Sequence, residues 1–442
     1  MTAKQFRTCV MIAAALAASG CGVFKKGTAK TPVLGERIAV LATETDVSVD
    51  PATAALPMTL PAPVANTSWT QSGGNEAKNP GHLALPPSIA QAWAVSIGQG
   101  TSVSARLAAA PIVADGRVYT IDTRATVRAF DAQTGGTVWT SQFGTEKGNE
   151  AALFGGGLAY SNGRIYATNG LGFVAALDAT NGGIAWQVRP GGPLRGSPTV
   201  ANGSVYVMSQ DNQLYSLKLE DGSGNWNQAA SLEIAGIFGV ASPAYAQGTV
   251  VAGFSSGELN AYRYENGRPL WQDALARTSI RTSVSSLSDV DADPVIDNGQ
   301  VIAIGQGGRM VALELITGQR MWELNLAGIA TPWVSGDWIF VVTDDAKLMA
   351  IARSNGKIRW ITQLPAFHNP KSKNGPISYT GPILAGGRLI VASTEGALIF
   401  VEPDHGAIQG QTDLKAAVSL PPVVANNMLY VLDDSGRLHA FR

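Results

Sequence analysis

Short apolar runs that alternate with polar positions recur along the chain, and each run is interrupted by a glycine or an asparagine. The clearest examples are AAPIVADGRVYTID (109–122), GSPTVANGSVYVMS (196–209), ADPVIDNGQVIAIG (292–305) and TGPILAGGRLIVAS (380–393). Two alternating runs joined by such a turn predict a β-hairpin. We therefore expect repeated pairs of short strands.

A second motif follows each hairpin and ends in a tryptophan. It is clearest in AFDAQTGGTVW (129–139), ALDATNGGIAW (176–186), AYRYENGRPLW (261–271) and ALELITGQRMW (312–322). The two motifs keep an offset of 28 residues in Pro111–Trp139, Pro198–Trp226, Pro243–Trp271, Pro294–Trp322 and Pro332–Trp360. Leu158–Trp186 keeps this offset without the proline, and Pro382–Gly410 keeps it without the tryptophan. The constant offset indicates a structural repeat whose length varies only in the loops between copies.

Four short strands per unit of about 40–50 residues are typical of a β-propeller. The eighth copy begins at Leu420 and lacks its last strand, whereas Gln91-Ala92-Trp93 resembles the end of a repeat. We predict an all-β fold, an eight-bladed propeller with four-stranded antiparallel blades, placed within residues 67–442. The N-terminal strand is expected to close the last blade.

The repeated tryptophans are predicted to have a structural role between neighbouring blades. A glycine four residues before each one suits a turn with positive φ, and the indole can pack against the next blade and donate its N–H to a carbonyl. The set comprises Trp139, Trp186, Trp226, Trp271, Trp322 and Trp360. The motif resembles the tryptophan-docking repeat of the pyrroloquinoline-quinone-type propellers.

That resemblance implies an alternative function, a quinoprotein dehydrogenase. Such enzymes hold quinone and calcium in the channel, with a vicinal disulfide, a stacking tryptophan and an aspartate base. The only cysteines are Cys9 and Cys21, the four histidines are scattered without ligand spacing, and no GxSxG, HExxH or P-loop motif occurs. We expect no catalytic residues, no cofactor and no metal site.

The N-terminus reads as a targeting segment. Lys4 and Arg7 precede the apolar run VMIAAALAA, which is too short to span a membrane and leads into Ala18-Ser19-Gly20-Cys21. This resembles the lipobox of bacterial lipoproteins, which implies a signal peptide over residues 1–20 and a lipid on Cys21. Gly22 favours the outer membrane. The alternative is an ordinary secretory signal followed by an unrelated cysteine.

Residues 21–66 are rich in Ala, Thr and Pro, and they are predicted to be a mostly extended tether to the membrane. The formal net charge of the chain is −1, and the sequence has no basic stripe. This charge pattern argues against a nucleic-acid partner.

The stretch SLSDVDADPV (286–295) places three aspartates at alternate positions. It imitates the start of a calcium-binding EF-hand loop, but Pro294 replaces the required glycine and Gln300 replaces the required glutamate. The repeat instead places the stretch at the end of the loop that enters blade 5. Asp289 and Asp291 are expected either to bind turn amides or to meet a cationic partner.

The lipobox, the tether, the tryptophan-docked propeller and LSDVD-x-x-PV together resemble the BamB family, lipoproteins of the outer-membrane β-barrel assembly (BAM) machinery. The resemblance implies a scaffold at the periplasmic face of the outer membrane. Its implied partners are the periplasmic domains of BamA, other subunits of that machinery and unfolded outer-membrane β-barrel clients. It assigns contact with BamA to Asp289 and Asp291, and to Ile237 and Phe238, where Phe238 replaces the family's arginine.

Overall fold

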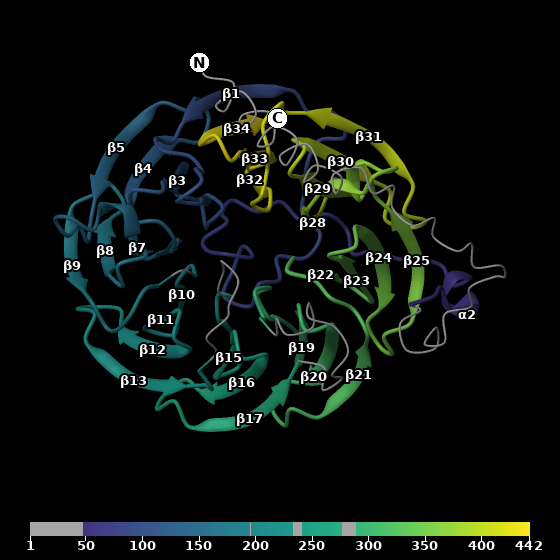
Figure 1. Ribbon diagram of the computed structural model, residues 1–442, viewed down its shortest axis with the longest axis horizontal. Coiled ribbons are helices and arrows are strands. Elements are labelled where there is room, and N and C mark those ends of the chain that lie inside the picture. Colours follow the sequence, from purple (N-terminus) through teal and green to yellow (C-terminus); the bar gives the residue numbers. More distant parts are fainter. Residues whose placement is uncertain (1–46, 195, 233–240, 276–288) are drawn as a thin grey trace, which may run out of the picture. The chain divides into compact units, whose positions relative to one another are not determined.

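The computed structural model describes residues 47–194, 196–232, 241–275 and 289–442. In this part of the chain the strands form eight four-stranded antiparallel sheets, together with a hairpin of β26 (Phe367–Asn369) and β27 (Asn374–Pro376). The sheets stand around a common axis as the blades of a ring (Figure 1). The predicted eight-bladed propeller is confirmed.

Seven blades are built from four consecutive strands, listed here from the channel outwards. Blades 1 to 4 are β2 (Ile112–Ala114), β3 (Arg117–Ile121), β4 (Thr126–Asp131) and β5 (Thr137–Gln142); β6 (Leu158–Ser161), β7 (Arg164–Thr168), β8 (Val174–Asp178) and β9 (Ile184–Val188); β10 (Thr199–Ala201), β11 (Ser204–Met208), β12 (Gln213–Lys218) and β13 (Gly224–Ala229); and β14 (Ala244–Ala246), β15 (Thr249–Gly253), β16 (Glu258–Arg263) and β17 (Pro269–Ala274). Blades 5 to 7 are β18 (Val295–Asp297), β19 (Gln300–Gly305), β20 (Arg309–Glu314) and β21 (Arg320–Leu324); β22 (Trp333–Ser335), β23 (Trp338–Val342), β24 (Lys347–Ala352) and β25 (Ile358–Gln363); and β28 (Tyr379–Ala385), β29 (Arg388–Ser393), β30 (Ala397–Val401) and β31 (Ile408–Asp413).

Blade 8 combines both ends of the described chain. Its inner strands are β32 (Val423–Ala425), β33 (Met428–Leu432) and β34 (Arg437–Phe441), and its outer strand is β1 (Gln91–Ser96). Trp93 pairs with Ala440 in the antiparallel register of β1 and β34. The predicted closure by the N-terminal strand is therefore confirmed.

Burial follows the position of a strand within its blade. Every residue of the second strand β11 is buried, whereas the outer strand β13 alternates between exposed and half-buried residues. A strand buried on both faces needs a continuous apolar run, and an edge strand needs apolar residues only on its inner face. The cores consequently lie between neighbouring blades.

Each repeated indole lies between its own blade and the next one. At Trp139 the ring packs on Gly182, whose φ is +75° and whose Cβ, if present, would lie 2.6 Å from a ring atom. The indole Nε1 donates to a main-chain carbonyl of the following blade: Trp139 to Ala179 (2.9 Å), Trp186 to Leu219 (3.2 Å), Trp226 to Tyr264 (2.8 Å), Trp271 to Leu315 (2.7 Å), Trp322 to Arg353 (2.7 Å) and Trp360 to Pro403 (2.8 Å).

Blade 7 replaces the tryptophan by a rearrangement within the blade. In the other blades the tryptophan pairs with a small residue of the third strand, as in Ala350 opposite Trp360. In blade 7 Phe400 of the third strand pairs with Gly410 of the fourth. The aromatic ring has moved one strand inwards, and the guanidinium of Arg388 stacks over it at 5.0 Å.

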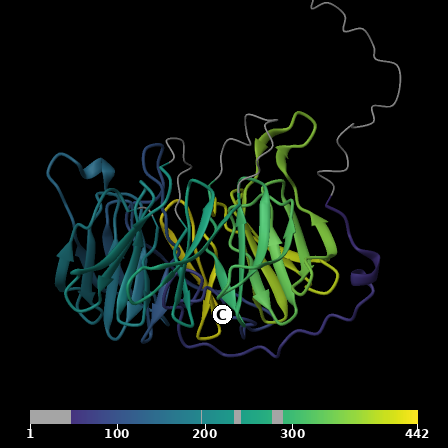
Figure 2. The same cartoon turned by 90° about the horizontal axis from the view of Figure 1, so that it is seen from below.

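Residues 64–85, here called the belt, contact all eight blades in one circuit beneath the channel. The hydrogen-bonded pairs, in chain order, are Asn66 with Val424 (blade 8), Trp69 with Val113 (blade 1), Thr70 with Tyr160 (blade 2), Gln71 with Val200 (blade 3), Glu76 with Tyr245 (blade 4), Ala77 with Ile296 (blade 5), Gly81 with Trp333 (blade 6) and Leu83 with Leu384 (blade 7). Val64 then pairs with Leu83, which joins the two ends of the belt. The N-terminal chain, purple in the figures, runs within the ring in Figure 1 and along one face of it in Figure 2.

The described residues upstream of the belt also lie on the propeller. They include the short helix α2 (Pro51–Ala54), which packs on β25. Residues 47–66 therefore differ from the extended tether expected over 21–66, because their backbone and apolar groups find partners on the blades. No helix in the described ranges is long and apolar enough to cross a membrane.

Candidate functional site at the entry to blade 5

The backbone of residues 289–291, here called the DVD segment, is fixed between two neighbouring blades. The amide of Val290 donates to the carbonyl of Phe254 in blade 4 (3.2 Å), and the amide of Gln306 in blade 5 donates to the carbonyl of Asp289 (2.9 Å). The turns that provide these partners connect second and third strands. The segment therefore lies at the end of the ring opposite the first-to-second-strand turns, because turns alternate between the two ends of an antiparallel blade.

Val290 anchors this segment by filling a socket lined by glycine. Its side chain is buried, and a Cβ on Gly253 would lie 2.4 Å from Val290 Cγ1. A larger residue at position 253 would displace the segment, because real Cβ atoms do not approach so closely. The loop entry is thus positioned by packing rather than by a regular strand, since β18 begins only at Val295.

The third aspartate of the stretch has a structural role. Asp293 is buried, and its carboxylate accepts hydrogen bonds from the Ser242 amide of blade 4 (2.6 Å) and the Ser72 hydroxyl of the belt (2.5 Å). Its own amide donates to the hydroxyl of Thr331, just before blade 6 (3.1 Å). Asp293 therefore joins three consecutive blades and the belt.

The other two aspartates differ from each other in exposure. Asp289 is buried and Asp291 is half-buried, so the structure does not present them as two equally accessible side chains. Burial, followed by repulsion from Asp289 and then Asp344, raises the pKa of Asp291 to about 7. Burial also raises the pKa of Asp344, although an interaction with the backbone of Ile329 opposes the shift. A cation placed beside Asp291 and Asp344 would stabilise the ionised form of both carboxylates.

Sequence reasoning missed the contribution of blade 6 to this surface. Asp344 lies in the second-to-third-strand turn of blade 6, and Ile329 in the preceding loop is 41% exposed. The repeat could have predicted this contribution, because it places the second-to-third-strand turn of blade 6 at the same end of the ring as the loop entering blade 5. The predicted residues Ile237 and Phe238 lie outside the described residues.

Replacing Asp291 by asparagine is expected to stabilise the protein at high pH. With a pKa of about 7 in the folded state against an ordinary value of 3.8, the folded protein binds more protons than the unfolded chain between about pH 4 and 7. Stability therefore falls as pH rises through this window. The free energy of unfolding of the variant should exceed that of wild type by about 1–2 kcal/mol at pH 8 and should equal it at pH 4. Urea unfolding at both pH values checks this, and an equal effect at both would contradict it.

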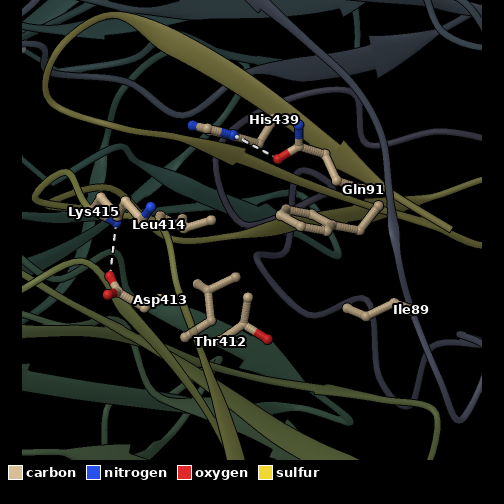
Figure 3. A pocket seen from close by; sticks show the side chains of 9 residues that line it. Ile89, Gln91, Thr412, Asp413, Leu414, Lys415 and His439 are labelled. Carbon is tan, nitrogen blue, oxygen red and sulfur yellow. Dashed lines mark hydrogen bonds between the residues drawn. The ribbon is translucent and has the colours of Figure 1, made fainter.

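A separate pocket of about 360 Å³ lies at the seam between blades 7 and 8 (Figure 3). Its lining includes Gln91, Thr412 and the buried His439, whose imidazole lies 2.9 Å from Asp433 and 3.4 Å from Gln91. The third and fourth strands of blade 8 come from opposite ends of the chain, so no turn joins them here. The pocket follows from this closure, and His439 is already engaged by its neighbours.

The residues near the belt do not fit a quinone and calcium. The face of Trp333 stacks on Trp69 of the belt, with centroids 6.2 Å apart and planes at 20°, and its Nε1 donates to the carbonyl of Gly81 (3.0 Å). Within the described ranges the only group of three His, Cys, Asp or Glu ligands is Glu402, Asp404 and His405, on the third-to-fourth-strand turn of blade 7. That turn lies on the outer side of the blade and cannot hold a calcium ion in the channel.

The fold and this site define the class of protein: a tryptophan-docked eight-bladed propeller whose candidate site is an acidic surface at one end of the ring. A family model described as outer membrane protein assembly factor BamB matches residues 90–147, 123–362 and 368–442. The chain therefore belongs to the BamB family.

Individual relatives agree with this assignment, and solved structures share the fold. BamB of Shigella dysenteriae is 30% identical over 394 residues, covering 79% of this chain and 88% of the relative, and BamB of Yersinia pestis is 27% identical over 355 residues, with the same coverage. The crystal structure of BamB from Moraxella catarrhalis superposes with a TM-score of 0.65 at 17% identity, covering 80% of this chain and 98% of that one. A europium-containing methanol dehydrogenase gives 0.69 at 13% identity, covering 85% and 98%, which shows a shared fold.

Proposed function

We propose that this protein is a non-enzymatic scaffold lipoprotein of the BAM complex at the periplasmic face of the outer membrane. In this role it docks on the periplasmic domains of BamA, beside the other subunits, and assists the folding and insertion of β-barrel clients. Its relatives are outer membrane protein assembly factors, which supports the assembly role. The lipobox at Cys21 supports the anchor.

The docking proposal rests on one observation: two carboxylates of the acidic surface are costly to ionise in the free protein. Asp291 and Asp344 keep raised pKa values beside the exposed Ile329, so the free protein holds carboxylates where water solvates them poorly. A cationic group of BamA would pair with these carboxylates, while Ile329 offers apolar contact. Charged groups desolvated beside an apolar anchor are typical of the energetically important part of an interface.

Reversing the charge of Asp291 should weaken binding to the isolated periplasmic domains of BamA. An Asp291→Arg substitution places a cation against the expected cationic group of BamA. Loss of such a charged contact weakens binding by about 2–5 kcal/mol when its partner stays buried. Titration calorimetry should show at least a tenfold rise in Kd, by the conversion of about 1.4 kcal/mol per tenfold. Glu265→Arg is the matched control, because Glu265 is exposed on a turn at the opposite end of blade 4. Equal affinities of the two variants would refute the docking site.

Cys21→Ser should release the protein from membranes. Without an acyl chain, the apolar run before residue 21 is too short to hold the protein in a bilayer. Fractionation should recover the variant in the soluble periplasmic fraction of cells that lack BamA binding, for example in the Asp291→Arg background. Retention in the membrane fraction under those conditions would contradict the lipid anchor.

A further inference from the structure

Residues 49–56, here called the clamp, bind the outer edge of blade 6. Val49 forms a parallel bridge with Ile358, and the amide of Asp50 donates to the carbonyl of Ile358 (2.9 Å). The carboxylate of Asp50 then caps α2 by accepting from the amide and the hydroxyl of Thr53, both at 2.8 Å. These hydrogen bonds, together with the one from Lys357, lower the pKa of Asp50 to about 2. The carboxylate therefore stays ionised, and Lys357 lies 3.1 Å away.

A buried arginine holds the other end of the clamp. Arg359 is 5% exposed and donates to the carbonyls of Thr53 (3.3 Å) and Leu56. Its remaining donors reach the carbonyl (2.9 Å) and the carboxylate (2.5 Å) of Asp404 in blade 7. The guanidinium also lies over the ring of Trp338, 5.2 Å from its centroid. An arginine engaged on all sides in this way has a fixed geometry.

Blade 6 differs from the other blades at this edge. The first three residues of β25 are buried, whereas the equivalent outer strands β13 and β17 begin with two exposed residues. The position before the docking tryptophan holds Val138, Asn225, Leu270 and Met321 in blades 1, 3, 4 and 5. Arginine at this position in blade 6 matches the presence of a bound segment, so the clamp has a dedicated receptor.

We propose that the clamp fixes the point where the membrane-anchored N-terminal chain leaves the propeller, so that the wall of blade 6 lies on average nearer the membrane than the wall of blade 2. The inference rests on the proposed lipid anchor at Cys21. The clamp also shortens the anchor, because its release would free residues 47–56, which span up to about 35 Å when extended. Residues 58–61 keep their own contacts with the propeller. The candidate docking surface at one end of the ring would then face sideways, along the membrane.

Energy transfer from the propeller to a vesicle tests this inference. Lipidated full-length protein would carry a fluorophore at Ser354→Cys in blade 6 or at Thr180→Cys in blade 2. Both positions are exposed on third-to-fourth-strand turns, and they lie on opposite sides of the ring. The vesicles would contain phosphatidylethanolamine, phosphatidylglycerol and an acceptor-labelled lipid. We expect stronger transfer from position 354 than from position 180.

Arg359→Gln should remove this difference and speed hydrogen exchange at the Asp50 amide. Arg388→Gln is the matched control, because Arg388 binds the carbonyls of Pro86 and Pro87 beyond the clamp, and it should keep the difference. Replacing residues 49–56 by a glycine–serine segment of equal length provides a second test that leaves every blade residue unchanged. Equal transfer from both positions in the unmodified protein, or an undiminished difference in the replaced one, would overturn the inference. Absence of transfer at both positions, with the Asp50 amide still protected, would instead contradict the lipid anchor and so the proposed function.

Discussion

Replacing Trp139 by alanine is expected to lower the free energy of unfolding by about 3–5 kcal/mol, as for other buried aromatic residues. The side chain is 8% exposed, packs flat on Gly182 of the next blade and contacts Tyr119, with centroids 5.9 Å apart. Removal of the indole leaves a cavity between two blades, and the glycine beneath has no side chain to fill it. Urea unfolding of the purified protein measures the loss.

Two further variants separate packing from hydrogen bonding at this position. Val138→Ala is the matched control, because Val138 precedes the tryptophan on the same strand but is 44% exposed. Trp139→Phe should lose only about 1 kcal/mol, since Arg117 and Tyr119 also donate to the Ala179 carbonyl that accepts from the indole. Stability within experimental error of wild type for Trp139→Ala would refute the role between blades.

Asp293→Ala should destabilise the protein by about 3 kcal/mol. The substitution leaves the amide of Ser242 and the hydroxyl of Ser72 without their acceptor, and a buried donor without a partner retains its full desolvation cost. Asp291→Ala is the matched control, two residues away, and should cause no loss of stability because its carboxyl already has a raised pKa. Thermal unfolding of both variants at pH 7.5 checks the contrast. Equal losses would mean that the two side chains share one structural role.

The fold was predictable because its information repeats. One offset of 28 residues recurs in successive copies, so the strand order, the turn glycines and the closing strand follow from alignment of the chain with itself. The exchange of Trp for Gly410 also had a signal, since Phe400 stands where other copies have alanine or serine. A compensating change of this kind is visible only when both strands are compared.

The site was only partly predictable, because burial depends on neighbours distant in the sequence. Asp289, Asp291 and Asp293 look alike in the sequence, yet their surroundings differ. Asp293 accepts hydrogen bonds from the belt and blade 4. Burial, then repulsion from Asp289 and from Asp344 of blade 6, raises the pKa of Asp291. The belt and the clamp occur once and have no period. Composition therefore described the clamp as part of the tether, and the repeat did not identify the belt within the propeller range 67–442. Asp50-Pro51 did carry a local signal, since an aspartate N-cap followed by proline is typical of a helix start.

The belt sets the order in which this protein can fold. It is synthesised before every blade, yet its partners extend to Val424, 358 residues after Asn66. Contacts of such long range form late, because a long loop must close before they contribute. The belt and the closing strand β1 can therefore settle only after blade 8 has emerged. Until then, β1 lacks its partner β34, and an unpaired strand of this kind needs protection from aggregation.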